Sequence, residues 1–475
     1  MASVGDLESG QVDIQLTRSQ KLATINEGSS LLGPEVEHRS FSSHRGGVTE
    51  SIRKLRSHTM TVSLLEKPSH DRRASAFMAG WNVSNLIQGT GILGVPYAVS
   101  MGGWAGVIAI LVIAWVCCFT GKLLVDCLYE DSKRTGQRKR VRTNYPEVGE
   151  AVLPGFGHKI VSIVQVCEMF GGIIMYIVLL ATVFNDMLKA YTELNIYHWA
   201  VICTYVAFPG IFIKRVSIIA WISMFSVFSL MVGLATLIIY CITEYDKMDI
   251  HNIPVFNAET FPIGFGIIVF SYCAHAVFPG VEGSMKEPKK FPAMMNFSFL
   301  LAAVIKCLLG LMAVLRFGTH TEQVITVSIK SHAFNYLSNA LVITNVFLAF
   351  PICFFIVLET WDTNFLPFFP HLQPDSSCHW FWLLITRLLL ATLALFLGIV
   401  VPHFGLLMGF VGSFTGTCLS FVFPCVFHMK LKWKKLKWYN IALRCFVIVF
   451  GLVCGGFGLV FSARDLAKSF NSQGF

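Results

Sequence analysis

Long apolar runs separated by short polar stretches make up the chain from Ala76 onward. An α-helix rises about 1.5 Å per residue, so about 20 apolar residues cross the ~30 Å hydrocarbon core of a bilayer. A transmembrane β-barrel has shorter segments of alternating hydrophobicity. The pattern therefore predicts an all-α polytopic membrane protein. Eleven transmembrane helices are expected, at 76–100, 103–128, 157–188, 197–213, 216–243, 262–283, 293–317, 333–361, 380–401, 403–428 and 439–462.

The composition agrees with this pattern, because 54% of the 475 residues are hydrophobic, 14% are charged and the mean hydropathy is +0.63. A soluble chain has about a quarter of its residues charged. Residues 1–75 differ from the rest, since they are polar, rich in Ser, Arg and Glu, and lack an apolar run of signal-peptide length. Such a composition is typical of a disordered tail.

Lys and Arg collect in the loops after spans 2, 4, 6 and 10, which lie on one side if the spans alternate. The positive-inside rule places these loops and the N-terminal tail in the cytoplasm. We therefore expect a cytoplasmic tail at 1–75, a transmembrane domain at 76–466 and a short lumenal C-terminus at 467–475. The net charge of +9 is mostly this bias. It indicates contact with an anionic lipid surface rather than with nucleic acid.

The first span contains a stretch that weakens its own helix, Gln88-Gly89-Thr90-Gly91, followed by Ile92, Leu93 and Pro96. A glycine inside a helix costs about 1 kcal/mol relative to alanine, and proline has no N–H to donate. Small residues also let neighbouring helices approach closely. The four polar and small residues together favour an unwound segment near the middle of the membrane.

The sixth span carries a second interruption. Ser271, Tyr272 and His275 lie near its middle, and Pro279 removes the N–H that would pair with the carbonyl of His275. Span 6 comes five spans after span 1. Each span reverses the direction of the chain, and five is odd, so spans 1 and 6 run in opposite directions. This arrangement predicts an inverted repeat, with spans 1–5 and 6–10 as its halves and span 11 as an addition.

Two interrupted helices at matching positions in inverted halves indicate a transport site. The N–H groups at the start of a half-helix bind a carboxylate, and freed carbonyls at a half-helix end suit an ammonium group. We therefore expect a small amino acid to bind with its carboxylate near Thr90–Leu93 and its ammonium near Ser271–His275.

Four motifs make the chain resemble the amino acid/auxin permease family over roughly Ala76–Leu466: "AGWNVSNLIQGTGILGVPYAV", "CCFTGKLLVDCLYE" with "RVRTNY", "FPIGFGIIVFSYCAHAVFPGVEGSM" and "VPHFGLLMGFVGSFTG". The resemblance implies the LeuT-like fold of the APC superfamily. Within the family, it is strongest to the branch that loads GABA and glycine into synaptic vesicles in exchange for lumenal protons. Gly89–Ile92 and His275 look more like the vacuolar or lysosomal neutral amino acid transporters of the family.

Ionisable residues within the spans are functional candidates, because each is costly in lipid. Glu168 lies near the middle of span 3, and its expected role is to carry or gate the proton. Lys306 is similarly deep in span 7, where it is a coupling residue or an ion-pair partner of Glu168. His275 is a substrate ligand, a proton acceptor or a polar filler. Arg387 is expected to extend its charge to the membrane surface.

Spans 8 and 10 supply weaker candidates. In the fold that the resemblance implies, span 8 faces the site, so Thr344 and Asn345 are expected to line the substrate pocket. Span 10 carries a stripe of small residues, for which close helix packing is the main expectation. The stripe consists of Gly405, Gly409, Gly412 and Gly416.

The tail and the remaining motifs complete the interpretation. Glu27 precedes Leu31-Leu32 by four residues, the spacing of an acidic dileucine signal that clathrin adaptors bind. No nucleophile–base pair, metal cluster or nucleotide loop indicates an enzyme, and no cofactor is expected beside the proton gradient, although chloride involvement is open. A channel is disfavoured by the paired helix breaks. An amino acid sensor with little flux remains an alternative.

Overall fold

The computed structural model describes residues 74–131, 137–212, 216–366, 369 and 379–472. The tail signal at Glu27, Leu31 and Leu32 lies outside this part of the chain. The helices and strands are α3 (Ala76–Gln88), η1 (Thr90–Gly94), α4 (Val95–Gly102), α5 (Trp104–Asp126), β1 (Tyr129–Asp131), β2 (Arg138–Arg140), α6 (Tyr145–Val152), α7 (Gly157–Leu188), α8 (Ile196–Ala207), η2 (Phe208–Phe212), α9 (Val216–Thr243), α10 (Phe261–Tyr272), α11 (Phe278–Ser284), α12 (Phe291–Phe317), α13 (His332–Phe365), α14 (His379–Val400), α15 (Phe404–Val411), η10 (Gly412–Val422), α16 (Phe423–Lys432) and α17 (Trp438–Ser472).

Eight helical runs in the described part are long and apolar enough to cross a bilayer. The predicted spans at 76–100, 197–213 and 262–283 are instead filled by shorter helices, namely α3 with η1 and α4, α8 with η2, and α10 with α11. In the first and third of these, the interruption itself shortens the continuous helix. The chain is therefore a mostly helical, multi-pass membrane protein.

The first predicted span is interrupted at its glycines. α3 starts where the Ser75 side chain accepts a hydrogen bond from the Met78 N–H at 3.2 Å, which is a standard N-cap. It ends at Gln88, because Gly89 leaves the helical region with φ −25° and ψ −169°. A 3₁₀ turn follows, and α4 then begins with Pro96 in its first turn, where a missing N–H costs nothing.

The sixth predicted span is interrupted in the same manner. α10 ends at Tyr272, and Cys273 is extended, with φ −76° and ψ 106°. α11 begins at Phe278 with Pro279 in its first turn. The predicted break at Ser271–His275 therefore falls at the end of α10 and in the non-helical residues that follow it.

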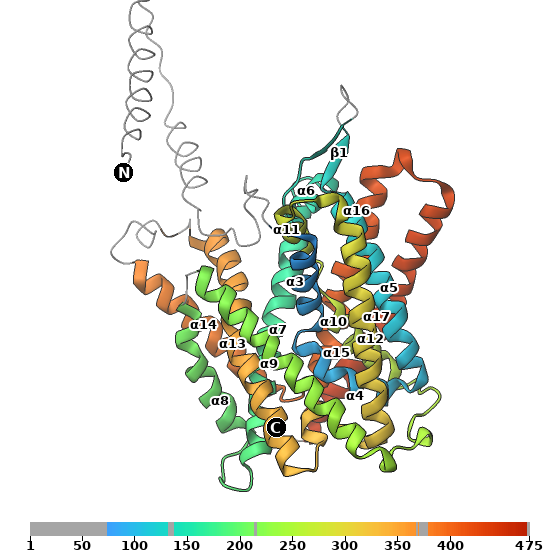
Figure 1. The fold of residues 1–475 in the computed structure, drawn as a ribbon. Helices are drawn as coiled ribbons and strands as arrows, with labels where there is room; N and C mark the ends of the chain where they lie inside the picture. The colour runs from blue at the N-terminus through green and yellow to red at the C-terminus, as the bar shows by residue number, and fades with distance from the viewer. Residues whose placement is uncertain (1–73, 132–136, 213–215, 367–368, 370–378, 473–475) are drawn as a thin grey trace, which may run out of the picture. The chain divides into compact units, whose positions relative to one another are not determined.

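The two breaks contact each other in the middle of the helix bundle. α10 packs against η1 and α4, and α12 packs against α3, α4 and α5 (Figure 1). A Cβ atom at Gly91 would lie 3.2 Å from the Cα of Ser271. The absence of a side chain at Gly91 thus lets the unwound segment lie directly on the end of α10.

The glycine stripe packs against α10, as its spacing suggests. A Cβ at Gly412 would lie 2.2 Å from the carbonyl oxygen of Gly266, and one at Gly416 would lie 2.6 Å from Val269. The same region contains an unpredicted feature, since residues 412–422 form a π-helix. Such wider turns are rare and occur often at functional sites.

A small hairpin departs from the all-α expectation. β1 and β2 pair antiparallel in the loop after α5, with Glu130 opposite Lys139 and Asp131 opposite Arg138. Opposite charges on directly paired residues stabilise such a ladder. The hairpin, α6, α11 and α16 lie at one end of the bundle (Figure 1), which is the end that carries the basic loops.

The last helix is longer than predicted. α17 continues to Ser472, ten residues beyond the expected end of span 11 at Ser462. The extension is polar, and Asp465 pairs with Arg464 and with Lys468 one turn later. The Asp465–Lys468 pair, three residues apart, is at the spacing that stabilises a helix in water, so hydropathy alone placed the end of the helix too early.

Candidate functional site

Lys306 on α12 lies between the two helix breaks. Its ammonium donates hydrogen bonds to the carbonyl of Ile87 at 3.0 Å, the carbonyl of Ser271 at 2.5 Å and the hydroxyl of Ser271 at 3.1 Å. The nitrogen also lies 3.5 Å from the centroid of the Tyr272 ring, which adds a cation–π contact. Lys306 is 0% exposed, and one side chain thus connects the end of α3 to the end of α10.

The expected ion pair between Glu168 and Lys306 is not formed. Among the residues that the structure describes, neither takes part in an ion pair. The backbone explains the difference, because the last carbonyls of a helix have no partner within it. Two helix ends near one lysine therefore supply the acceptors that a carboxylate was expected to supply.

Glu168 belongs to a separate row of polar side chains. It is 3% exposed, its Oε1 has no described hydrogen-bond partner, and its carboxyl group is within hydrogen-bonding reach of the Cys273 thiol. The Cys273 sulfur lies 3.2 Å from the Ser420 hydroxyl, which lies 2.9 Å from Nδ1 of His275. Nε2 of His275 is 3.0 Å from the Thr120 hydroxyl. The row thus joins α7, the break after α10, η10 and α5.

Both ring nitrogens of His275 contact members of this row of polar side chains. His275 is 0% exposed, and its two nitrogens contact Ser420 and Thr120 rather than η1. Of the alternatives open from the sequence, this placement supports the proton acceptor or the polar filler. It does not support a direct substrate ligand.

The sequence did not point to Tyr176, which lies beside η1, or to Cys353, which contacts Tyr176. The Tyr176 hydroxyl on α7 interacts with Thr90 and with Cys353 of α13. A Cβ at Gly172 would meet nothing within 4 Å. Glu168, Gly172 and Tyr176 recur every four residues and so lie along neighbouring turns of α7, which is the signal that would have identified Tyr176.

The other residues expected near the first break are buried in it. Ile92 and Leu93 are 0% and 1% exposed, and Thr90 is 9% exposed. Gln88 is also buried, and its Oε1 has no described hydrogen-bond partner. The structure therefore brings the predicted residues of span 1 into the same buried region as Ser271 and Tyr272.

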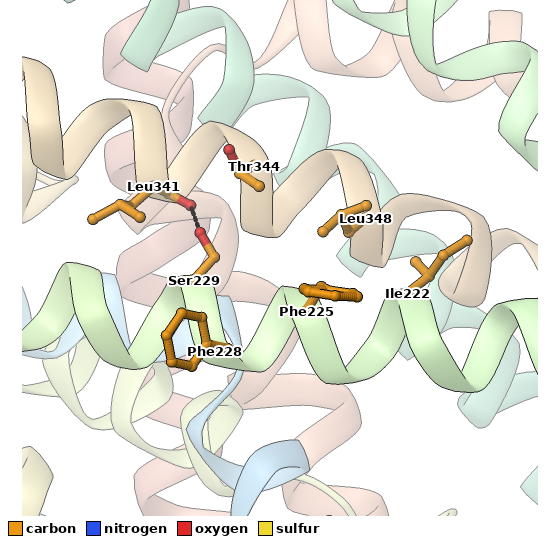
Figure 2. A pocket seen from close by; sticks show the side chains of 7 residues that line it. All are labelled: Ile222, Phe225, Phe228, Ser229, Leu341, Thr344 and Leu348. Carbon is orange, nitrogen blue, oxygen red and sulfur yellow. Dashed lines mark hydrogen bonds between the residues drawn. The ribbon is translucent and has the colours of Figure 1, made fainter.

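Thr344 and Asn345 are placed elsewhere, where α13 contacts α9. The Asn345 amide donates to the Ser226 carbonyl at 2.7 Å and to its hydroxyl at 2.9 Å. Thr344 lines a groove of about 570 Å³ between these helices (Figure 2). The groove is lined by Ile222, Phe225, Phe228, Ser229, Leu341, Thr344 and Leu348. Both residues thus serve the contact between α9 and α13 in this structure.

Arg387 does not extend its charge to the surface as expected. Its side chain is 6% exposed, donates to the Leu383 carbonyl at 3.2 Å and lies 5.6 Å from the centroid of the Phe212 ring. Its charge is attracted by Asp362. The arginine therefore packs among α14, η2 and α13.

A polar cluster closes the end of the bundle that carries the basic loops. Arg140 of the hairpin forms an ion pair with Glu282 of α11 at 3.5 Å and donates to the carbonyl of Pro279 at 2.7 Å. The Tyr129 hydroxyl also donates to Glu282. Ala74 exchanges backbone hydrogen bonds with Ser284 and Lys286. The segments before α3 and after α11 are thereby held together.

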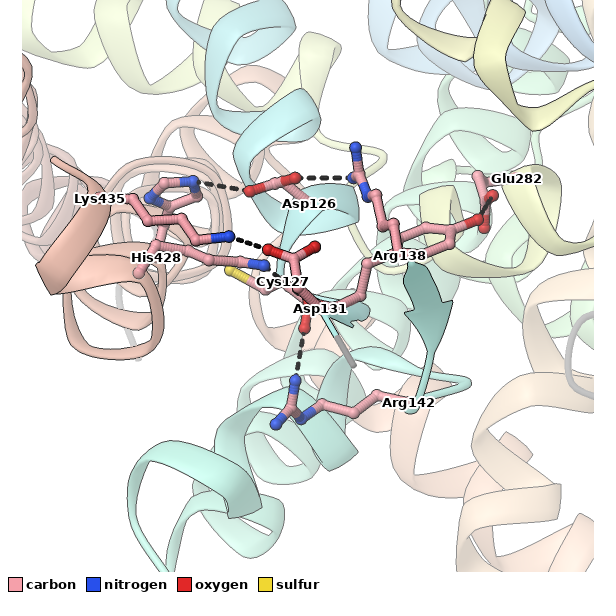
Figure 3. A network of polar contacts seen from close by, with 10 residues as sticks. Asp126, Cys127, Asp131, Arg138, Arg142, Glu282, His428 and Lys435 are labelled. Atoms are coloured by element: carbon pink, nitrogen blue, oxygen red, sulfur yellow. Dashed lines mark hydrogen bonds and ion pairs between the residues drawn. The ribbon is translucent and has the colours of Figure 1, made fainter. Parts of the chain in front are cut away.

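Further ion pairs connect the hairpin to α5 and α16 (Figure 3). Asp126 at the end of α5 forms an ion pair with Arg138 at 2.6 Å, and its other carboxylate oxygen lies at hydrogen-bonding distance, 3.1 Å, from Nε2 of His428. Lys432 donates to the carbonyl of Tyr129 at 2.7 Å. We use the name basic-face cluster for Asp126, Tyr129, Arg138, Arg140, Glu282, His428 and Lys432.

A solved structure shows the class of fold to which this arrangement belongs. It is Mhp1, a nucleobase-cation-symport-1 family transporter, in a closed conformation with bromovinylhydantoin bound. The likeness has a TM-score of 0.50 at 14% identity and covers 84% of this chain and 94% of the other. The likeness shows that the two chains share a fold.

The sequence identifies the family. The model of the transmembrane amino acid transporter protein family matches residues 72–464, and this chain belongs to that family. It is 34% identical to the vesicular inhibitory amino acid transporter of Xenopus tropicalis over 84% of this chain and 78% of the relative. For the vesicular GABA transporter of Caenorhabditis elegans, the identity is 32% over 84% and 81%. Amino acid transporter AVT1D of Arabidopsis thaliana is 26% identical over 82% and 69%.

Proposed function

We propose that this protein is a proton-coupled antiporter that loads GABA and glycine into acidic cytoplasmic vesicles, including synaptic vesicles. The observation that carries the proposal is the contact of two interrupted helices at Gly91 and Ser271, in the middle of a transporter fold. Paired interrupted helices expose backbone groups that suit a small zwitterion. The names of the vesicular relatives support the substrate class and the compartment.

The substrate carboxylate binds at the start of the second half of span 1. The N–H groups at the N-terminal end of η1 and α4, around Thr90–Leu93, attract a negative charge. The ammonium group binds carbonyls that follow α10, at Tyr272 and Cys273, because Lys306 already holds the carbonyl of Ser271. Tyr176 lines the same space through its contact with Thr90, and Cys353 contacts Tyr176.

Proton coupling is assigned to Glu168, with His275 further along the same row of side chains and Lys306 at the adjoining end of α10. One buried oxygen of the Glu168 carboxyl group has no hydrogen-bond partner among the described residues, so the group is poised to gain or lose a proton as its surroundings change. The row through Cys273 and Ser420 connects it to His275. Proton movement along this row is linked to the break in span 6, where the substrate ammonium binds.

The membrane arrangement is part of the proposal. Eleven spans, formed by two inverted repeats of five and one further helix, place the basic-face cluster and the N-terminal tail in the cytoplasm and the C-terminus in the lumen. The closed cluster then corresponds to a site shut toward the cytoplasm. The tail signal Glu27, Leu31 and Leu32 directs sorting through clathrin adaptors.

Uptake into proteoliposomes tests the proposal. We expect labelled GABA and glycine to accumulate under an imposed inside-acid pH gradient and to stop accumulating when a protonophore collapses it. Gradient-driven uptake of larger neutral amino acids alone would move the protein to the vacuolar or lysosomal type. Binding without flux would favour an amino acid sensor.

A further inference from the structure

Three oxygens surround the ammonium nitrogen of Lys306. They are the carbonyl oxygen of Ile87 at 3.0 Å and the carbonyl and hydroxyl oxygens of Ser271 at 2.5 and 3.1 Å. The Ser271 hydroxyl donates its own hydrogen to Ile268 at 2.7 Å, so a lone pair is directed at Lys306. All three donors of the ammonium thus have an oxygen acceptor in the protein.

The charge of this site is balanced without a carboxylate. Ile87 and Ser271 lie in the last turns of α3 and α10. Each helix C-terminus carries about −0.5 of an elementary charge, so two of them offset about one positive charge. Among the described residues, no carboxylate forms an ion pair with Lys306.

The same oxygens are of the chemical type that an alkali-metal cation binds. Hard cations bind carbonyl and hydroxyl oxygens, and in transporters the unwound carbonyls and half-helix C-terminal ends coordinate Na⁺ or H⁺. A charge of about −1 from the two helix ends suits a monovalent ion and not a divalent one. The ammonium of Lys306 has the charge and the donors to fill such a site.

We propose that the carbonyl of Ile87 and the carbonyl and hydroxyl of Ser271 form a monovalent-cation site that the Lys306 ammonium occupies in place of Na⁺. The native protein then needs no alkali cation to hold α3 against α10. Removal of the ammonium exposes a latent Na⁺ site between these helices. The inference depends on the contacts of Lys306 and not on the identity of the transported amino acid.

Thermal unfolding of the purified protein in detergent tests the proposal without a transport assay. The melting temperature Tm is measured in NaCl and in choline chloride at equal ionic strength for the native chain and for three variants. K306A removes the ammonium and leaves space for an ion. K306M fills the same space with an apolar chain of similar length. K122A removes a lysine that contacts Asn296 outside the site.

We expect Na⁺ to raise the Tm of K306A by about 2–4 °C, in a saturable manner, relative to choline. The native chain, K306M and K122A are expected to have equal Tm values in the two salts. Adding Ser271→Ala to K306A removes one oxygen and is expected to abolish the Na⁺ effect. This response would not change if the transport proposal failed.

Two results would overturn the inference. One is a Tm of K306A that is the same in Na⁺ and choline. The other is a saturable Na⁺ stabilisation of the native chain, which would mean that the ammonium leaves the site open. If K306A cannot be recovered folded, the Tm of the native chain still tests the proposal. The proposal requires this Tm to be the same in NaCl and choline chloride, and a higher Tm in NaCl contradicts it.

Discussion

The middle of the bundle and its basic face hold the same two interrupted helices in different ways. In the middle, one buried ammonium connects α3 to α10 and uses backbone carbonyls as its acceptors. At the basic face, several ion pairs and backbone bonds connect the hairpin, α11 and the start of α3. The polar contacts in the middle come from one side chain, that of Lys306, whereas those at the basic face are distributed over several side chains and backbone groups.

This difference separates two tasks of a transporter. A buried charge that loses its partners is costly, so the central contact has few alternative arrangements. Ion pairs with exposed members exchange with water at little cost, and Arg138 and Asp126 have side chains that are 53% and 35% exposed. The Arg140–Glu282 pair is more buried, at 16% and 1%, so it is the member of the cluster that holds α11 most firmly. We infer that the basic-face cluster opens and closes during transport while the Lys306 contact persists.

The largest expected effect is at the centre. Lys306→Met leaves the carbonyls of Ile87 and Ser271 without their donor, and each buried unsatisfied group costs about 1–3 kcal/mol. A cost of about 1.4 kcal/mol changes an equilibrium constant tenfold. We therefore expect gradient-driven uptake to fall more than about tenfold. The matched control is Lys432→Met at the basic face. Equal uptake by the two variants would show that the loss of a lysine is no more costly in the middle of the bundle than at the basic face.

The next effect concerns proton coupling. Glu168→Gln retains the shape of the side chain and removes its charge, so it is expected to abolish gradient-driven accumulation. Exchange of labelled for unlabelled substrate should persist, because exchange needs no net proton movement. Glu150→Gln, near the end of α6 and outside the site, serves as the control. Accumulation that survives in Glu168→Gln would contradict the role of Glu168.

A smaller effect is expected at the basic face. Arg140→Ala removes the pair with Glu282 and the bond to Pro279, which loosens α11. Uptake should fall less than in Lys306→Met, while maleimide should label Cys273 faster than in the native chain. Arg138→Ala removes an exposed pair worth about 0–1 kcal/mol and should change neither. An unchanged labelling rate in Arg140→Ala would argue against opening at this face.

The smallest effect lies in the loop after α9. Hydrogen bonds from Lys247, and then from Arg316, lower the pKa of Glu244 from its usual 4.5 to about 2. A lowered pKa in the folded state stabilises the fold above the usual pKa, and this stabilisation is lost as the pH falls from about 4.5 to about 2. The Tm of Glu244→Gln should lie below that of the native chain at pH 7, and the gap should close in this range. A gap that is constant with pH would exclude the linkage.

The sequence predicted the features that local rules determine. Glycine and proline have fixed effects on a helix, so the breaks at Gly89 and before Pro279 were placed correctly. The depth of Lys306 followed from hydropathy, but its partners did not, because Ile87 is 219 residues away and offers only its backbone. The hairpin after α5 was missed, because its ladder is three residues long and polar.

Two predicted site residues, Thr344 and Asn345, show that a sequence does not reveal which face of a helix meets the site. Thr344 and Asn345 were chosen because span 8 faces the site in the fold that the resemblance implies, but a helix has several faces. The hydrogen bonds of Asn345 direct it to Ser226 on α9. Cys353, further along the same helix, contacts Tyr176 beside the break. The rotation of α13 about its axis is a property of tertiary packing that a single sequence does not reveal.

The most direct test of the central claim is the binding of labelled GABA and glycine to purified Gly91→Leu, with Gly456→Leu as the matched control. A side chain at Gly91 enters the contact between the two breaks, whereas a Cβ at Gly456 meets nothing within 4 Å. We expect Gly91→Leu to remain monodisperse but to lose binding, and Gly456→Leu to bind as the native chain does. Unchanged Kd values for Gly91→Leu would contradict a substrate site at the crossing of the two interrupted helices.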